Sequence, residues 1–357
     1  MNLDDLTTFN SIDRDNMLGH IDALPDQFQD AWALAQMQPL PDSHQKPRQI
    51  VLCGMGGSAI GGDLTAALIS ATSRVPMMVV RGYELPAYAT GPETLVIVSS
   101  HSGNTEETLS AADQAVSRNV RMLAITTGGA LADHAQTHGY PLWKFEYKSQ
   151  PRAALGWSFG LLLGLVHRLK LISTLEADIA EAIDLLRQEK RRYGAASPLA
   201  QNPAKRGAGQ LVGRIPVFYG GGVFEPVARR WKAQLNENAK VWAQYEPMPE
   251  GDHNAIVGIS FPAELMTHMQ AIFISSRELD HPRVALRHDL TFKLFLQYGI
   301  MVDTFHPRGV SVLAQMCHAI QYGDYLSFYT AMAYKADPTL IAPIIELKEQ
   351  MARSRAG

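Results

Sequence analysis

The stretch Val96–Thr108, VIVSSHSGNTEET, changes character twice. It begins as an apolar, β-branched run typical of a buried strand, continues as a run of hydroxyl and amide side chains, and ends where an alanine-rich amphipathic segment runs to about Val116. This order predicts a strand, a hydroxyl-rich turn and a helix. Hydroxyls and backbone N–H groups then converge where the helix dipole favours an anion, and Gly103 allows close approach of the backbone. An N-capped helix with purely local capping explains the same order.

The lack of basic residues in this turn limits the kinds of ligand that it could hold. The stretch contains no Lys or Arg, so it fits a monophosphate held by hydroxyls and amides. A nucleotide triphosphate would usually require a glycine-rich loop that ends in Lys, and that loop is absent.

A glycine-rich turn lies upstream, directly after another predicted strand. Residues 49–53 (QIVLC) run into Gly54–Asp63, GMGGSAIGGD, and a helix follows to about Ser70. This is the general phosphate- or nucleotide-binding unit of open α/β sheets. The turn alone is equally compatible with a dinucleotide site. However, the Rossmann spacing is not met cleanly, and Arg81 stands where the acidic ribose partner would follow the next strand.

Strands and helices alternate along the chain, which predicts the α/β fold class. We expect each sheet to be mostly parallel, flanked by helices in three layers (αβα), with ligands at the carboxyl ends of the strands. In the first half we expect further strands at 76–80, 95–98, 121–126 and 142–145. In the second half we expect strands at 215–219, 271–275 and 301–304, and helices at 225–243 and 310–333.

The second half repeats the plan of the first, which predicts a duplication. Its glycine turn, Gly220–Gly222, lacks the Ser/Thr signature, so we expect only one phosphate site per chain. We predict four parts: an N-terminal helical arm (1–42), a first domain with the phosphate loops (43–170), a connecting helix and linker (171–208), and a second domain with the catalytic residues (209–357). The apolar arm is expected to pack across a domain or a subunit.

Composition excludes several classes of function. The chain has 357 residues, 46% of them hydrophobic and 19% charged, and its net charge of −3 gives no electrostatic footprint for nucleic acid. The longest apolar stretch, 161–166, is too short to cross a membrane, and the acidic N-terminus does not resemble a signal peptide. Cys53 and Cys317 stand far apart in apolar contexts, as expected for buried free thiols in the cytoplasm.

Several motifs together carry a resemblance to a known family. SSHSGNTEET is similar to the phosphosugar-binding signature of SIS (sugar isomerase) domains, and GMGGSAIGGD to their first glycine loop. PRAA at 151–154, LNENAK at 235–240 and the pair His253-Asn254 resemble motifs of the bifunctional phosphoglucose/phosphomannose isomerases. So do the N-terminal SIDRDNM and the C-terminal GDYLSFY, DPT and ELK segments. The acidic residue that often follows the His-Asn pair is Ala255 here.

The resemblance implies a fold, an activity and a set of site residues. It implies two SIS-type domains and an aldose–ketose isomerase (EC 5.3.1) that interconverts glucose 6-phosphate and/or mannose 6-phosphate with fructose 6-phosphate through ring opening and a cis-enediolate. The implied substrate-phosphate ligands are Gly57, Ser58, Ser100, Ser102 and Thr105. The implied catalytic residues are Glu237, His253, Arg152 and Lys348.

Each catalytic residue type suits its implied role. A carboxylate in a partly buried helix can act as a general base, which suits Glu237 as the group that moves a proton between C1 and C2. An imidazole can move the ring-opening proton, which suits His253. A fixed guanidinium stabilises the charge of the enediolate, which suits Arg152.

The resemblance also implies a homodimer in which the neighbouring chain donates His253, with a hexose 6-phosphate as ligand and with no cofactor or metal. Two alternatives remain: an isomerase of another phosphosugar, and a non-catalytic sugar-phosphate-binding regulator, which would normally carry a basic DNA-binding domain. A glucosamine-phosphate synthase would need an N-terminal cysteine, whereas this chain begins Met1-Asn2-Leu3.

Overall fold

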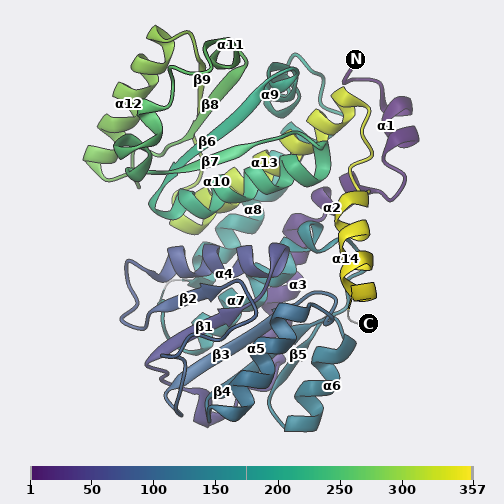
Figure 1. The fold of residues 1–357 in the computed structure, drawn as a ribbon, viewed down its shortest axis with the longest axis vertical. Helices are drawn as coiled ribbons and strands as arrows, with labels where there is room; N and C mark the ends of the chain where they lie inside the picture. Colours follow the sequence, from purple (N-terminus) through teal and green to yellow (C-terminus); the bar gives the residue numbers. More distant parts are fainter. Residues whose placement is uncertain (1, 174, 355–357) are drawn as a thin grey trace.

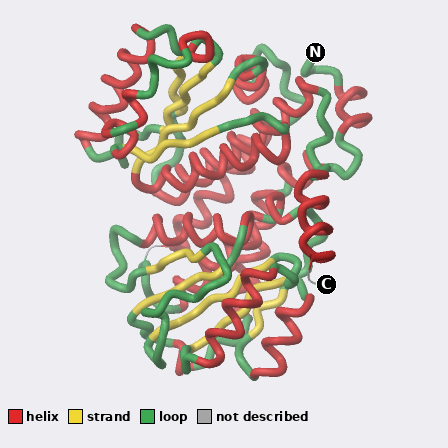
Figure 2. Tube along the Cα trace, viewed as in Figure 1, coloured by secondary structure: helices red, strands yellow, loops and turns green. Residues whose placement is uncertain are grey.

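The computed structural model describes residues 2–173 and 175–354. These residues form two sheets, each flanked by helices and lying one above the other (Figure 1). Neighbouring strands in both sheets pair in parallel. The predicted α/β class with two three-layer units is therefore confirmed. Figure 2 shows the strands of each unit enclosed between layers of helix.

The first sheet has the strand order β2-β1-β3-β4-β5. Its strands are β1 (Gln49–Cys53), β2 (Met77–Val80), β3 (Thr94–Ser100), β4 (Arg121–Thr126) and β5 (Leu142–Lys144). Ile50 and Leu52 pack with helix α7 (Leu155–Arg168), while Val51 packs with α5 (Glu106–Ser117) and α6 (Gly129–His138) on the other face. Because both faces are covered, these strands are continuous apolar runs rather than alternating ones.

The second sheet has the order β7-β6-β8-β9, which matches β2-β1-β3-β4 strand for strand. Its strands are β6 (Ile215–Gly221), β7 (Gln244–Met248), β8 (Met269–Ile274) and β9 (Met301–Phe305). Helices α10 (Glu225–Gln234) and α13 (Val312–Tyr334) cover one face, and α11 (Ala263–Met266) and α12 (Pro282–Gln297) cover the other. The sequence prediction missed β7, because the expected helix 225–243 ends at a π-helical turn, Leu235–Ala239.

The N-terminal arm packs against its own chain. It consists of α1 (Leu6–Ile12), α2 (Met17–Asp22) and α3 (Leu24–Met37), and α3 lies along α7. A Cβ added at Gly160 would lie 2.8 Å from Ala31 Cβ, and one at Gly164 would lie 2.2 Å from Ala35 Cβ. Small residues on both helices thus allow close approach, and most of the arm's large apolar side chains are buried without a second subunit, although Leu6 and Met37 are exposed.

The remaining helices connect and follow the two domains. α4 (Gly56–Ile69) follows the glycine turn, and α8 (Leu175–Tyr193) joins the domains as expected for a connecting helix. α9 (Pro203–Leu211) begins within the segment 171–208, where we expected a connecting helix and a linker, and Asn202 caps it by accepting from the N–H groups of Ala204 and Lys205 at 3.0 and 3.1 Å. Cys53 and Cys317 are buried and free, as predicted. In the part of the chain that is described, we find no helix with both the length and the apolar character needed to span a bilayer.

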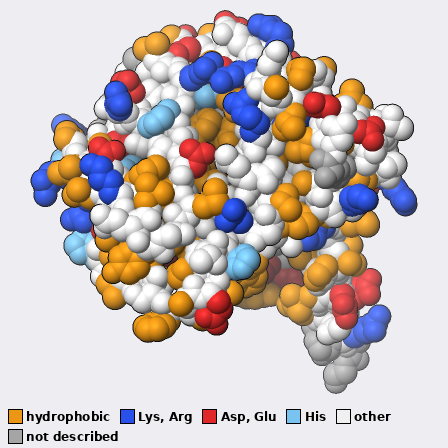
Figure 3. All heavy atoms as spheres, turned by 90° about the horizontal axis from the view of Figure 1, so that it is seen from above, with side chains coloured by type: hydrophobic (Ala, Val, Ile, Leu, Met, Phe, Trp, Pro, Cys, Tyr) orange, Lys and Arg blue, Asp and Glu red, His pale blue; other side chains and the backbone are white. Residues whose placement is uncertain are grey.

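The last helix, α14 (Ala342–Ser354), is exposed along its described length. It lies beside both domains in Figure 1, on the side that carries the C-terminus. On the molecular face shown in Figure 3, acidic, basic and hydrophobic side chains are interspersed. Several exposed side chains of α14 are apolar, among them Ile344, Ile345 and Leu347.

We predict that Gly164→Ala destabilises the protein by about 1–3 kcal/mol, because the new methyl group overpacks the contact with Ala35. Urea unfolding measures the change. Ala35→Gly should restore part of the lost stability, since it removes the clashing Cβ. Gly209→Ala, where a Cβ would meet no atom within 4 Å, is the matched control and should not destabilise. Equal effects at Gly164 and Gly209 would contradict the close α3–α7 packing.

Candidate functional site

The hydroxyl-rich turn lies where β3 ends and α5 begins. Ser100 Oγ lies 2.9 Å from Thr105 Oγ1 and accepts a hydrogen bond from the N–H of Gly103 at 3.1 Å. Ser102 Oγ accepts from the N–H of Asn104 at 3.3 Å. Gly103 has φ +71°, and a Cβ there would lie 1.8 Å from Gly128 O, so only glycine fits. The turn therefore gathers hydroxyl groups at the N-terminus of α5, as predicted from the sequence.

The glycine turn after β1 joins this hydroxyl turn and reaches the start of α7. Ser58 Oγ accepts from the N–H of His101 at 3.2 Å, which links the two turns. A Cβ at Gly57 would lie 2.6 Å from Pro151 O and 3.2 Å from Arg152 N. The missing side chain at Gly57 therefore allows the glycine turn to lie directly against the backbone that carries Arg152.

Arg152 is a buried cation that joins the two domains. It lies on a 3₁₀ turn, Pro151–Ala153, and is only 4% exposed. Its Nε donates to Asn238 Oδ1 at 2.6 Å, and its Nη1 donates to Glu237 Oε2 at 3.2 Å. Its Nη2 donates to the carbonyl oxygens of Pro338 and Thr339 at 2.6 and 2.9 Å. Burial lowers the pKa of Arg152, and the Glu237 carboxylate opposes that shift.

Glu237 lies on the π-helical turn that ends α10. Its side chain is 31% exposed, so it is held by Arg152 on one side and open to solvent on another. The next residue, Asn238, is buried and donates from Nδ2 to Ser327 Oγ on α13 at 2.9 Å. A π turn displaces the backbone of a helix, and such turns are frequent at functional sites. Here it brings two consecutive side chains, Glu237 and Asn238, onto one guanidinium.

A second buried ion pair supports the first, and our sequence analysis did not identify it. Arg230 on α10 donates from Nε and Nη2 to Asp324 on α13 at 3.0 and 2.7 Å, and its Nη2 also donates to Arg152 O at 3.0 Å. Gln234 Nε2 donates to the same carboxylate at 2.9 Å. Burial raises the pKa of Asp324, and Arg230 and Gln234 oppose the shift. The only sequence signal was the GDYLSFY segment, in which Asp324 stands.

Lys240 also belongs to this site, although we did not single it out from the sequence. It takes the left-handed conformation at φ +58°, ends the π turn, and donates from Nζ to Asn238 O at 3.1 Å and to Asp337 O. Burial, and then the neighbouring Arg152, lower the pKa of Lys240 to about 8. Lys240 and Arg152 together hold the segment at 337–339 that leads to α14.

The second domain has the equivalent edge, but its hydroxyls are already bonded. β8 corresponds to β3, and Ser275 and Ser276 follow it as Ser99 and Ser100 follow the apolar part of β3. Ser275 Oγ and Ser276 N–H both donate to Asp280 Oδ2 at 2.6 and 3.1 Å. Ser276 Oγ donates to Glu278 Oε2 at 3.0 Å. Carboxylates of the same chain therefore stand where an anionic ligand would bind.

Two of the predicted catalytic residues lie apart from this cluster in the described chain. Glu237 precedes the start of β7, whereas His253 follows its end, and a strand of this length spans about 15 Å. His253 is exposed. Lys348 lies on the exposed helix α14, and within the described residues it forms no hydrogen bond or ion pair. In one chain, therefore, Arg152 and Glu237 meet, while His253 lies at the opposite end of the second sheet.

A search for metal-binding clusters among the described residues found no group of three or more His, Cys, Asp or Glu side chains that could hold a metal ion. The groups of the site that could bind an anion are backbone N–H groups, hydroxyls and the Arg152 guanidinium.

Family models match both domains. A model for the SIS domain matches residues 44–140, and a model for the bacterial phospho-glucose isomerase C-terminal SIS domain matches residues 200–351. The first domain carries the hydroxyl and glycine turns, and the second carries Glu237, His253 and Lys348. The fold and the site therefore define a protein built from two SIS domains.

Relatives of known name narrow the class. A bifunctional phosphoglucose/phosphomannose isomerase from Caldicellulosiruptor bescii is 38% identical over 92% of this chain and 97% of its own length. One from Aquifex aeolicus is 32% identical over 85% of this chain and 90% of its own length. The chain belongs to the bifunctional phosphoglucose/phosphomannose isomerase family. A D-glucosamine-6-phosphate 4-epimerase from Sulfolobus acidocaldarius is more distant, at 29% identity over 58% of this chain and 63% of its own length.

Solved structures share the fold at low sequence identity. A hypothetical protein from Thermus thermophilus gives a TM-score of 0.74 at 16% identity, covering 96% of this chain and 91% of the other. The C-terminal domain of glucosamine-fructose-6-phosphate aminotransferase from Francisella tularensis gives 0.68 at 15% identity, covering 91% and 98%. These likenesses concern the arrangement of the two domains, not the chemistry.

We predict that Ser100→Ala combined with Thr105→Ala weakens the binding of inorganic phosphate about tenfold or more, because two of the three hydroxyls that the turn offers are lost. Isothermal titration calorimetry measures the change. Ser110→Ala is the matched control, since its hydroxyl bonds Tyr83 O on the exposed side of α5. If phosphate bound equally well to the double variant, the turn would not be the phosphate site.

Proposed function

We propose that this protein, an aldose–ketose isomerase by its family, interconverts glucose 6-phosphate and/or mannose 6-phosphate with fructose 6-phosphate through ring opening and a cis-enediolate. The observation that carries the proposal is the 3.2 Å contact between Arg152 and Glu237 beside the phosphate-binding turns. A base and a fixed cation at one point are what enediolate chemistry requires. Glucose 6-phosphate and mannose 6-phosphate differ only at C2, which becomes planar in the enediolate, so both lead to the same intermediate.

The substrate phosphate is held by the hydroxyl turn and the glycine turn in this proposal. Gly57 lies against the backbone of Pro151 and Arg152, so the glycine turn borders the 3₁₀ turn that carries the guanidinium. Binding energy from the non-reacting phosphate then positions the distant sugar carbons against the catalytic groups. Ser58, Ser100, Ser102 and Thr105 take the role of phosphate ligands.

Glu237 removes the proton from C2 of the aldose and returns it to C1, or the reverse. A guanidinium has five N–H groups, and Arg152 uses one on Nε, one on Nη1 and both on Nη2. The N–H that remains is on Nη1, the same nitrogen that donates to Glu237. We assign this N–H to the developing enediolate oxygen, next to the base that creates the negative charge.

His253 opens the sugar ring, and it comes from the second subunit of a homodimer. Their placement supports this proposal, since His253 and Glu237 lie at opposite ends of the second sheet in one chain. The exposed apolar side chains of α14 offer further surface for a subunit contact, and Lys348 lies among them. The N-terminal arm does not support the dimer as we expected from the sequence, because it is buried against its own α7.

We predict that Glu237→Gln lowers kcat by about 10²- to 10⁴-fold for both hexose phosphates, the usual contribution of a general base. Phosphate affinity should survive, since the turns are unchanged. Coupled assays started from each aldose measure the rates. Glu225→Gln, an exposed carboxylate at the other end of α10, is the matched control and should stay active. A near-normal kcat for Glu237→Gln would refute the base assignment. If the native enzyme turned over neither hexose phosphate, the protein would instead be an isomerase of another phosphosugar or a regulator.

We predict that mixing two inactive variants, Glu237→Gln and His253→Ala, under conditions of subunit exchange restores activity. A mixed dimer has one site with both lesions and one intact site, so it should reach up to about half of the native rate by site counting. The double variant mixed with His253→Ala is the control and should stay inactive, since it supplies no chain with an intact histidine. If no activity returned in the first mixture, or if the active enzyme were a monomer by light scattering, the shared histidine would be ruled out.

A further inference from the structure

A second polar cavity lies in the second domain, beside the edge strand β9. It has a volume of about 260 Å³ and is lined by residues from β9, α8, α9 and α13. Three arginines line it, Arg192, Arg206 and Arg308. Ligand pockets for drug-sized molecules are typically about 300–1,000 Å³, so this one suits a smaller compound.

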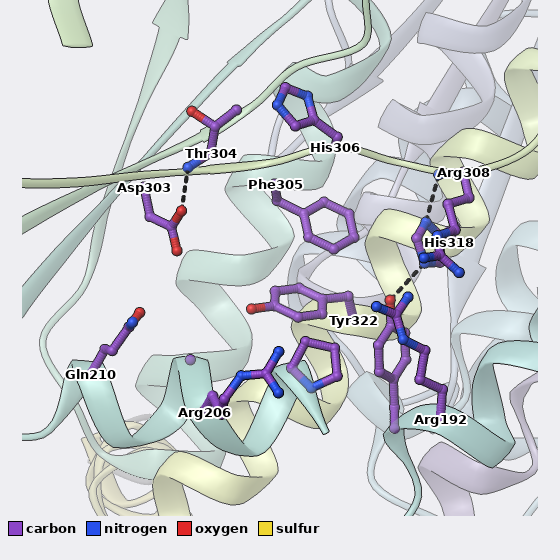
Figure 4. A pocket seen from close by; sticks show the side chains of 13 residues that line it. Arg192, Arg206, Gln210, Asp303, Thr304, Phe305, His306, Arg308, His318 and Tyr322 are labelled. Carbon is purple, nitrogen blue, oxygen red and sulfur yellow. Dashed lines mark hydrogen bonds between the residues drawn. The ribbon is translucent and has the colours of Figure 1, made fainter. Parts of the chain in front are cut away.

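The charged groups of the cavity are separated into two ends (Figure 4). Arg192 and Arg308 lie at one end, and Asp303 and Gln210 lie at the other, with Arg206 between them. Arg192 and Arg308 share the buried Glu189, which accepts from them at 3.3 and 2.9 Å, so this end keeps a net positive charge, and Arg206 adds a further positive charge beside it. The opposite end offers a carboxylate and an amide, which accept hydrogen bonds from hydroxyl groups.

Much of the polar capacity in this cavity is unused. Within the described residues, each of the three guanidiniums donates one side-chain hydrogen bond, and Arg206 donates its own to Ala200 O at 2.6 Å. The hydroxyl of Tyr322 and the side chain of Gln210 have no hydrogen-bond partner among these residues. Burial and the nearby Asp303 raise the pKa of Tyr322, so the phenol stays protonated and can donate.

An apolar wall in the middle separates the two ends. The rings of Phe305 and Tyr322 stack at 4.2 Å between centroids, and the Tyr322 hydroxyl points toward the Asp303 side (Figure 4). A short carbon chain can lie along such a wall while its polar ends reach the groups on either side. A phosphate monoester with hydroxyl groups at its other end has this distribution of charge.

The cavity is separate from the candidate active site. Tyr322 lies on the face of α13 that lines the cavity, together with His318 one turn earlier. Asp324, which binds Arg230, follows Tyr322 by two positions and so projects from the opposite face of the helix. α13 therefore stands between the cavity and the Arg152–Glu237 site.

We propose that this cavity binds a small hydroxylated phosphate monoester, of the size of glycerol 3-phosphate, with its phosphate at the arginine end and its hydroxyls at Asp303 and Gln210. The proposal departs from the single phosphate site per chain that we expected from the sequence. It does not rest on the isomerase function, since the binding is independent of turnover.

The test is calorimetric titration of the full chain with glycerol 3-phosphate, in the Ser100→Ala/Thr105→Ala background that weakens the active-site turn. Arg206→Gln should weaken binding about tenfold or more, as expected for a lost charge-assisted hydrogen bond. Arg48→Gln, an exposed arginine of the first domain, is the matched control and should leave binding unchanged. Binding that Arg206→Gln does not alter, or no binding at all in this background, would overturn the proposal.

Two more variants separate the two ends of the cavity. Asp303→Asn should strengthen the binding of inorganic phosphate, because it removes a repelling charge. The same variant should lower the ratio of affinities for glycerol 3-phosphate and inorganic phosphate. Tyr322→Phe keeps the stacked ring and removes a hydroxyl with no partner in the described chain, so it should weaken glycerol 3-phosphate binding without lowering the melting temperature. If inorganic phosphate and glycerol 3-phosphate bound equally well to the native cavity, recognition of the hydroxyl end would be wrong.

Discussion

The buried guanidinium of Arg152 is the interaction on which the arrangement of this protein depends. It begins in the first domain and donates to side chains of the second domain and to the carbonyls before α14. A buried cation that loses its partners costs several kcal/mol, so each of these acceptors is constrained by the charge. Arg152 therefore constrains the second domain, the C-terminal segment and Glu237 at one point.

A second arginine makes this arrangement rigid. Arg230 pairs with Asp324 and also donates to the backbone carbonyl of Arg152. Because α13 also carries Ser327, which accepts from Asn238, the same helix supports the acceptor of Arg152 Nε. Both sides of the Arg152–Glu237 contact are thus anchored on α13. Catalytic groups held in this way need little reorganisation during a reaction, which is the basis of electrostatic stabilisation in enzymes.

The sequence predicted the first sheet better than the second for a physical reason. β1, β3 and β4 are covered on both faces and read as apolar runs, so periodicity identifies them. β7 is an edge strand of sequence QYEPM with a half-exposed pattern, which gives no apolar run to recognise. The π turn before it was also missed, because the contacts that hold its residues, such as those of Asn238 with Arg152 and Ser327, arise from tertiary packing.

The site residues also differ in how well the sequence could predict them. The hydroxyls at Ser100, Ser102 and Thr105 could be predicted because one continuous segment brings them together. Asp324 and Lys240 could not, since their proximity to Arg152 arises from packing between segments far apart in the chain. Local motifs predict groups that the backbone alone assembles, whereas groups assembled by tertiary packing require the fold.

The two domains share a strand order but differ at the carboxyl ends of their strands. This difference explains why only the first domain offers an anion-binding turn there. After β3 the hydroxyls bond one another and the turn has no internal carboxylate, so it has capacity for an external anion. After β8 the corresponding serines donate to Asp280 and Glu278, so an incoming phosphate would meet two negative charges in place of free donors. The second domain is consequently free to use the opposite end of its sheet, where α10 ends, to present Glu237 to the first domain. The duplicated architecture thus offers the proposed phosphate cradle at the carboxyl edge of one sheet and the proposed base at the amino edge of the other, with Arg152 at their junction.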